Sequence, residues 1–168
     1  LKQSLGGNQI TKVSGIINGT TNYILSRMDK EAASYADVLK DAQDLGYAES
    51  DPAADVEGAD AADKIAILSG LAFGGSINRA DIQTTGINLL EGIDVCYARK
   101  LGYGIKLLAI SEKREIQSTI TNSQPLSVWV EPTLVPEDNP LAGVNGVNNA
   151  ILVEGNPIGK VMFFGPGA

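Results

Sequence analysis

Two kinds of pattern occupy separate parts of this sequence, and their order is its strongest constraint on the fold. Apolar residues recur at helical spacing through most of the first hundred positions, whereas later segments show continuous or alternating apolar runs typical of strands. Regular alternation of strand and helix would favour a parallel βαβ winding instead. The segregation therefore predicts an α+β fold, with helices packed on one face of a mixed, largely antiparallel β-sheet.

Four helices are expected from periodicity and from helix-end signals. The first spans 22–29 and begins after Thr20 or Thr21, either of which can cap it. Ser34 and Asp37 start a second at 35–45, and Gly46 ends it. A third covers 58–73 and ends at Gly74. The fourth covers 89–101. The residues expected to face the core on the last two are Ala61, Ile65, Leu68 and Ala72, then Leu90, Ile93, Tyr97 and Leu101.

Six segments read as strands because they are β-branched, continuous or alternating. They cover 9–17, 105–110, 116–121, 127–130, 148–153 and 158–164. The last two flank Glu154 to Pro157, whose residues favour a hairpin turn. Neither an internal repeat nor a linker interrupts the pattern, so residues 1–168 are expected to form a single domain.

Composition excludes several classes of function. The 13 basic residues against 20 acidic ones give a net charge of −7, which disfavours nucleic acid as a partner. No apolar run is long enough for a membrane span, so we expect a soluble, cytoplasmic protein without a membrane partner. The chain has no histidine and one cysteine, Cys96. Serine–histidine and cysteine–histidine catalysis and histidine zinc sites are therefore excluded.

Acidic residues concentrate between positions 37 and 63, where nine of the twenty occur beside only two lysines. Those on the predicted helices can simply form solvated faces or favour helix N-termini. The loop at 46–55 is different, because it joins two helices that we expect to pack together. It would gather Tyr47, Glu49, Asp51 and Asp55 at their shared end. This arrangement predicts the mouth of a polar pocket.

Two further groups near this loop have both a structural and a functional interpretation. Asp60 and Lys64 are four residues apart, which is explained by a surface ion pair alone. If apolar neighbours partly bury Lys64, the same pair can transfer a proton. Gly19 and Thr20 offer backbone donors and a hydroxyl where a helix begins, suitable for a small anionic or carbonyl group or for a plain helix cap. Glycine-rich nucleotide-binding fingerprints are missing from this sequence.

A family resemblance joins these features. Segments 15–25, 42–52 and 55–64 resemble homoserine dehydrogenase, and 102–109, 134–136, 140–142 and 164–168 continue the resemblance in order. It implies NAD- or NADP-dependent interconversion of L-homoserine and L-aspartate 4-semialdehyde, a step in threonine, methionine and isoleucine biosynthesis. It also implies that this chain is the substrate and dimerisation domain of a longer protein, whose nucleotide-binding Rossmann part lies elsewhere. We therefore expect the chain alone to be inactive.

The resemblance also implies residue roles. Glu49 and Asp60 correspond to acids that hold homoserine, and Lys64 to a lysine that transfers a proton to or from the substrate oxygen. Further substrate-site positions are matched by Gly19, Thr20, Tyr47 and Asp55.

The cofactor-binding residues, a further family lysine and a segment that supplies a monovalent-cation site are expected outside this chain. The resemblance implies a homodimer whose two copies meet through the sheet. A non-catalytic substrate-binding or dimerisation module is the alternative.

Overall fold

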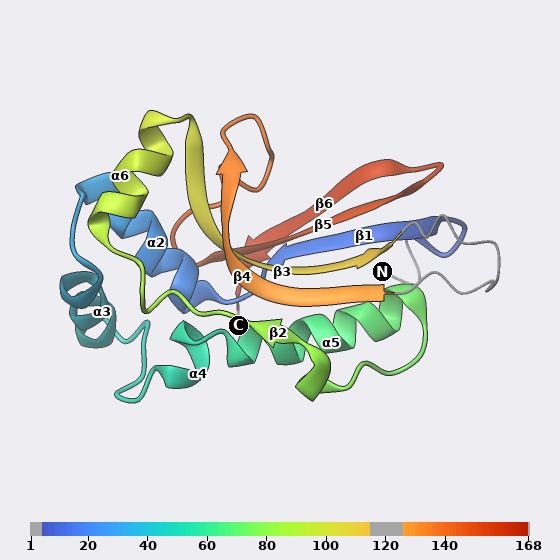
Figure 1. Ribbon diagram of the computed structural model, residues 1–168, viewed down its shortest axis with the longest axis horizontal. Helices are drawn as coiled ribbons and strands as arrows, with labels where there is room; N and C mark the ends of the chain where they lie inside the picture. Colours follow the sequence, from blue (N-terminus) through green and yellow to red (C-terminus); the bar gives the residue numbers. More distant parts are fainter. Residues whose placement is uncertain (1–4, 115–125, 168) are drawn as a thin grey trace.

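The computed structural model describes residues 5–114 and 126–167, which form a six-stranded sheet with helices on one face (Figure 1). The helices are α2 (Gly19–Glu31), α3 (Tyr35–Asp44), α4 (Ala53–Val56), α5 (Ala59–Phe73) and α6 (Gly92–Lys100), with a 3-10 turn η1 (Arg79–Asp81). The strands are β1 (Gln9–Ile16), β2 (Gln83–Thr84), β3 (Tyr103–Lys113), β4 (Leu126–Pro136), β5 (Asn148–Asn156) and β6 (Gly159–Pro166).

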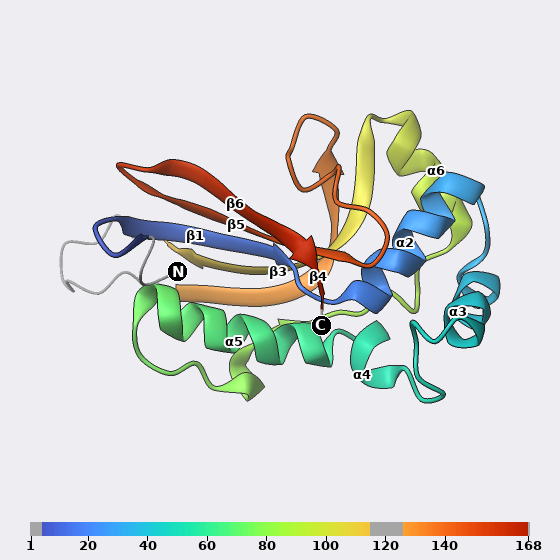
Figure 2. The same ribbon diagram turned by 180° about the vertical axis from the view of Figure 1, so that it is seen from behind.

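The strand order is β2-β4-β3-β1-β5-β6. All neighbours pair antiparallel except β2 and β4, which are parallel. Helix α5 runs along the sheet, while α2, α3 and α6 gather at one end of it (Figures 1 and 2). The predicted α+β class, with helices on one face of a mixed and largely antiparallel sheet, is confirmed.

Apolar side chains fill both faces of the sheet. On the helix side, Ile24 and Ile65 pack with Val13 and Val130 in one large cluster. On the other side, a smaller cluster contains Leu108 and Leu152, and it is covered by Leu141 and Val144 from the segment between β4 and β5. Helices therefore cover one face, and an irregular segment covers the centre of the other.

The helix that follows β1 begins earlier than predicted, because its cap is Asn18 rather than Thr20 or Thr21. Asn18 has extended backbone angles, and its Oδ1 accepts a hydrogen bond of 2.9 Å from the backbone N–H of Thr21. Thr21 donates its own hydroxyl to Asn18 as well. An asparagine is as good a cap as a threonine, and its place one residue before Gly19 decides where the helix starts.

The helix-end signals at α3 and α5 are confirmed. Ser34 accepts from the N–H of Asp37 at the start of α3. Gly46 follows α3 with φ of 77°, and the N–H groups of Tyr47 and Gly46 bond back to the carbonyls of Ala42 and Gln43. This closure requires a left-handed residue, which glycine supplies. Helix α5 ends at Gly74 and buries Ala61 and Ile65 as predicted, while Leu68 and Ala72 are half-buried.

The predicted inner face of α6 is wrong. A capping box between Glu91 and Asp94 starts this helix at Gly92, and it buries Val95 and Ala98 against α2 and β3. The other face, with Ile93, Tyr97 and Leu101, is 50–70% exposed. Leu90 precedes the helix and is half-buried. The larger apolar side chains lie on the exposed face of the helix, so periodicity favoured the wrong side.

Strand β4 is longer than the predicted 127–130 and continues through Pro132 to Pro136. Its outer neighbour β2 pairs only at Trp129 and Val130. Beyond that point β4 is an edge strand, where a proline without an N–H is tolerated. The predicted hairpin is confirmed, although Glu154 and Gly155 belong to β5 itself, paired with Lys160 and Gly159. The strand predicted at 116–121 lies outside the described residues.

The expectation that helices α3 and α5 pack together is wrong. The main contacts of α3 are with α2, and α5 packs on β1, β3 and β4. The two helices lie in different parts of the molecule (Figure 1). The short helix α4, which the sequence did not predict, connects the loop after α3 to α5.

Gly86 lies where the segment after β2 passes closest to α4. A Cβ atom at this position would lie 2.2 Å from the carbonyl oxygen of Val56, which accepts a hydrogen bond from Ile87. We expect Gly86→Ala to lower the free energy of unfolding by about 3 kcal/mol, because the backbone must move. Gly104→Ala is the control, since nothing lies within 4 Å of its Cβ position. Denaturant unfolding measures both, and equal stability of the two variants would contradict the packing described.

Lys106 on β3 is 4% exposed, and this burial lowers its pKa to about 8 against an opposing effect of Asp29. Between about pH 8 and the usual lysine pKa near 10.5, the unfolded chain holds a proton that the folded chain has lost. The free energy of unfolding must therefore rise with pH in this window, relative to Lys106→Met. Denaturant unfolding across the window measures the difference, and a constant difference would contradict the lowered pKa.

Candidate active site

A polar cavity lies where β1 gives way to α2. Its volume is about 530 Å³. Five parts of the chain line it: the residues after β1, the loop after α3, the segment formed by α4 and α5, the segment that enters β5, and the residue after β6. The lining residues are Asn18, Gly19, Thr20, Gly46, Tyr47, Ala48, Glu49, Asp55, Asp60, Lys64, Val147, Asn149 and Gly167. All seven predicted site residues are therefore brought together.

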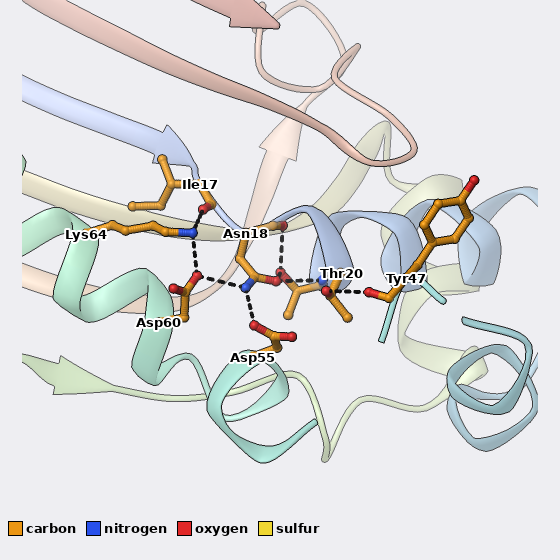
Figure 3. A network of polar contacts seen from close by, with 8 residues as sticks. Ile17, Asn18, Thr20, Tyr47, Asp55, Asp60 and Lys64 are labelled. Carbon is orange, nitrogen blue, oxygen red and sulfur yellow. Dashed lines mark hydrogen bonds and ion pairs between the residues drawn. The ribbon is translucent and has the colours of Figure 1, made fainter. Parts of the chain in front are cut away.

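Asn18 connects the carboxylates of this cavity to the start of α2 (Figure 3). Its Nδ2 donates to Asp55 Oδ1 at 2.7 Å and to Asp60 Oδ2 at 3.0 Å. Its Oδ1 accepts from Thr21, as described above. The side chain is 5% exposed, so both ends of the amide are buried and satisfied. Asn18 therefore holds two like charges side by side and caps a helix at the same time.

Lys64 forms the predicted pair with Asp60, and its Nζ lies 2.7 Å from Asp60 Oδ2. The same Nζ donates to the carbonyl oxygen of Ile17 at 3.1 Å. The Lys64 side chain is 49% exposed in this chain, so about half of it is buried. Ala61 and Ile65 are buried in the core, whereas Lys64 lines the cavity.

Thr20 and Tyr47 hold the loop after α3 against α2. Thr20 Oγ1 donates to the carbonyl oxygen of Tyr47 at 2.8 Å. The Tyr47 ring packs on Tyr23 with centroids 4.8 Å apart and points away from Asp55 and Asp60 (Figure 3). Tyr47 thus lines the site, while its ring packs against α2.

Gly19 allows the segment before β5 to approach α2. A Cβ atom at Gly19 would lie 3.0 Å from the carbonyl oxygen of Val147. Glu49 lies across the cavity on an exposed loop, where its carbonyl accepts from Gln43 at 3.0 Å. Within the described residues, the Glu49 carboxylate takes part in no ion pair.

Sequence reasoning missed Asn18, Val147 and Asn149. Asn18 carried a usable signal, because it is a favoured capping residue directly before a helix. Asn149 carried none, since it is about 130 positions away from Asn18 in the sequence. The Oδ1 of Asn149 is buried and has no partner among the described residues. Unpartnered buried acceptors are uncommon and often occur at functional sites.

An apolar cavity of about 480 Å³ adjoins the polar one and shares Lys64 and Asn149 with it. Its other walls come from β1, α5, β5 and β6: Ile17, Ile67, Leu68, Ala150, Ile151, Phe163, Phe164, Gly165 and Pro166. The two cavities place a charged, hydrogen-bonding surface next to an apolar one.

Within residues 5–114 and 126–167, no three His, Cys, Asp or Glu side chains converge as metal ligands. No helix in the same residues has the length and hydrophobicity needed to cross a bilayer.

Comparison with known proteins places this fold and site in a family. The sequence profile of homoserine dehydrogenase matches residues 1–168. A homoserine dehydrogenase from Synechocystis is 55% identical over all 168 residues, and one from Bacillus subtilis is 44% identical. The chain spans 38% and 37% of the lengths of these two relatives.

Solved structures agree with the sequence comparison. A homoserine dehydrogenase from Thiobacillus denitrificans superposes with a TM-score of 0.93 at 46% identity, over 99% of this chain and 37% of that one. A hyperthermophilic archaeal homoserine dehydrogenase mutant in complex with NADPH gives 0.75 at 27% identity, over 99% of this chain and 44% of that one. On both sequence and structure, the chain belongs to the homoserine dehydrogenase family.

Proposed function

We propose that the protein containing this chain interconverts L-homoserine and L-aspartate 4-semialdehyde with NAD or NADP, and that the polar cavity holds the amino-acid substrate. The main support is the polar group at the start of α2, where Asn18 donates to Asp55 and Asp60. Lys64 pairs with Asp60 in the same group. Family membership supports the reaction, and the charges of the cavity support the class of substrate.

The cavity offers complementary groups for each end of an amino acid. Glu49, Asp55 and Asp60 outnumber Lys64, so the site attracts a cationic amino group. The N–H groups of the first turn of α2 lie beside Gly19 and Thr20, and they suit the substrate carboxylate. In this arrangement Glu49 and Asp60 bind the amino and hydroxyl groups, as the resemblance implies.

Lys64 is the candidate for proton transfer. Two of its three N–H donors are used by Asp60 and Ile17, which leaves one for the substrate oxygen. In the oxidation, homoserine loses a hydride and its hydroxyl proton to become the aldehyde. The neutral amine form of Lys64 would take that proton and become the ammonium form; in the reverse direction the ammonium form would donate one to the aldehyde oxygen. Asp60 keeps the Lys64 ammonium oriented.

The family uses a nicotinamide cofactor, which supplies the hydride chemistry. The adjoining apolar cavity fits the flat ring of such a group, since Ile17, Phe163 and Phe164 line it and Asn149 offers an unpartnered amide oxygen. We expect the rest of the cofactor, and any monovalent cation, to be bound by another part of the protein.

Substitution of Lys64 tests this assignment in the intact protein. We expect Lys64→Met to lower kcat for homoserine oxidation by about 100-fold or more, because proton transfer is lost. Glu49→Gln should mainly raise KM for homoserine, by about tenfold, because one of the carboxylates that attract the substrate amino group is lost. Steady-state kinetics with NAD and NADP measure both.

Asp63→Asn is the matched control, since Asp63 lies on the same helix but pairs with Arg79 away from the cavity. It should stay within about twofold of the wild type. A near-normal kcat in Lys64→Met together with an unchanged KM for homoserine in Glu49→Gln would contradict the catalytic assignment. That result would favour the alternative of a non-catalytic substrate-binding or dimerisation module.

Asn18→Asp separates the capping role of Asn18 from its role as a donor to the carboxylates. The new carboxylate still caps α2 but faces Asp55 and Asp60 without a proton to donate. We expect the free energy of unfolding at neutral pH to fall by about 2 kcal/mol and KM for homoserine to rise.

The control is Asn78→Asp, which also caps through its oxygen, at the start of η1. Thermal unfolding of both variants gives the comparison. Equal stability losses would show that the carboxylate pair does not depend on Asn18.

A homodimer formed through the sheet, and a cytoplasmic location, stay predictions. The exposed edge strand β6 is compatible with a dimer, because its outer backbone groups are free to pair and Met162 and Phe164 are exposed.

A further inference from the structure

The segment at 144–149 forms a wall of the polar cavity, although it comes from the opposite end of the sequence. Val147 and Asn149 line the cavity, and the carbonyl oxygen of Val147 lies close to Gly19. Gly146 has φ of 67°, so the chain turns sharply within this segment. Within the segment, Asn148 Nδ2 donates to the carbonyl oxygen of Asn145 at 2.9 Å, and the remaining contacts come from side chains of other elements.

Asn22 fastens both ends of the turn to α2. Its Nδ2 donates to the carbonyl oxygens of Val144 at 3.2 Å and Asn148 at 2.9 Å. One turn further along α2, Ser26 Oγ accepts from the N–H of Gly146 at 3.1 Å. Asn22 is 1% exposed, so its hydrogen bonds are shielded from water.

Lys106 reaches the same turn from the sheet. Strand β1 pairs with β3 as far as Gly15 and Ala109, so Lys106 lies on the part of β3 that extends beyond β1. Its Nζ donates to the carbonyl oxygen of Val144 at 2.6 Å, to Asn145 Oδ1 at 2.9 Å and to Asn22 Oδ1 at 3.4 Å. All three donors of the ammonium group are satisfied in this geometry.

Burial of an ammonium group in a protein core lowers the stability of the fold, because the charge loses its hydration. Lys106 is 4% exposed, and within the described residues no carboxylate forms an ion pair with it. Burial of a lysine without a paired acid costs stability that an apolar side chain of the same length would not. Its lowered pKa reflects the same cost. Such a cost indicates a role for which an apolar side chain would not serve.

We propose that Lys106 is a positioning residue for the substrate site: with Asn22 it clamps the 144–149 turn, and so places Val147 and Asn149 against the start of α2. Lys106 itself lies outside both cavity linings, so its role would be to position the wall and not to contact the substrate. The inference rests on the proposed function for its link to homoserine, but the clamp exists independently of catalysis.

Kinetics of the intact protein test the proposal. We expect Lys106→Met to raise KM for homoserine about tenfold with a smaller change in kcat, because a wall of the binding site moves while Lys64 stays in place. A residue needed only for stability would not change KM at a temperature where the variant is folded. Lys12→Met is the control, because Lys12 lies on the neighbouring strand β1 and pairs with Glu112 near the surface.

A double-mutant cycle with Asn22→Ala tests whether the two residues act on one turn. If they form a shared clamp, the double variant raises KM little more than the larger single change does. Effects that multiply fully would overturn the shared clamp. If Lys106→Met fails to fold, Asn145→Ala is the substitute test. It removes one acceptor of Lys106 and should also raise KM for homoserine.

Hydrogen exchange of the backbone amides at 145–149 gives a readout that needs no turnover. Exchange should be faster in Lys106→Met and unchanged in Lys12→Met. An active wild type with unchanged KM and unchanged exchange in Lys106→Met would overturn the proposal. A wild type without homoserine oxidation would overturn the proposed function instead, and the exchange data would still decide whether the clamp exists.

Discussion

The hydrogen bonds of Asn18 join the fold of this chain to its candidate chemistry. One end of the amide closes the first turn of α2, and the other end holds Asp55 and Asp60 close together. Two nearby carboxylates repel each other, and the Asn18 donor offsets that repulsion for both, while Lys64 pairs with Asp60 as well. The start of α2 and the placement of Asp55 and Asp60 therefore share one side chain.

Around Asn18, the site is assembled from distant parts of the chain. The sheet brings β5 beside β1, so the turn at 144–149 meets the start of α2. Lys106 and Asn22 then fix the turn from two directions. Polar groups inside the fold therefore define one wall of a cavity whose opposite wall is an exposed loop. Many binding sites combine a rigid wall with an accessible loop, because binding residues often lie on loops that a rigid scaffold positions.

How much of this was predictable depends on how local each signal is. Ser34, Gly46 and Gly74 act within one helical turn, and they marked helix ends correctly. The Asp60–Lys64 pair was also predictable, since four residues on a helix fix its geometry. The inward face of α6 was not, because burial of Val95 and Ala98 depends on how closely the helix approaches β3. Strand pairing brings Asn149 and Lys106 close to the start of α2, and apolar periodicity does not reveal which strands pair.

We propose that the polar cavity binds an amino acid with a terminal hydroxyl group, and that Lys64 accepts the proton of this hydroxyl during the oxidation. The most direct test is the rate at which the intact protein reduces NAD or NADP with L-homoserine, compared between wild type and Lys64→Met, with L-2-aminobutyrate, which lacks the hydroxyl, as the substrate control. We expect rapid reduction by the wild type with L-homoserine but not with L-2-aminobutyrate, and a rate lower by about two orders of magnitude or more in the variant. Equal rates in wild type and Lys64→Met would contradict this proposal.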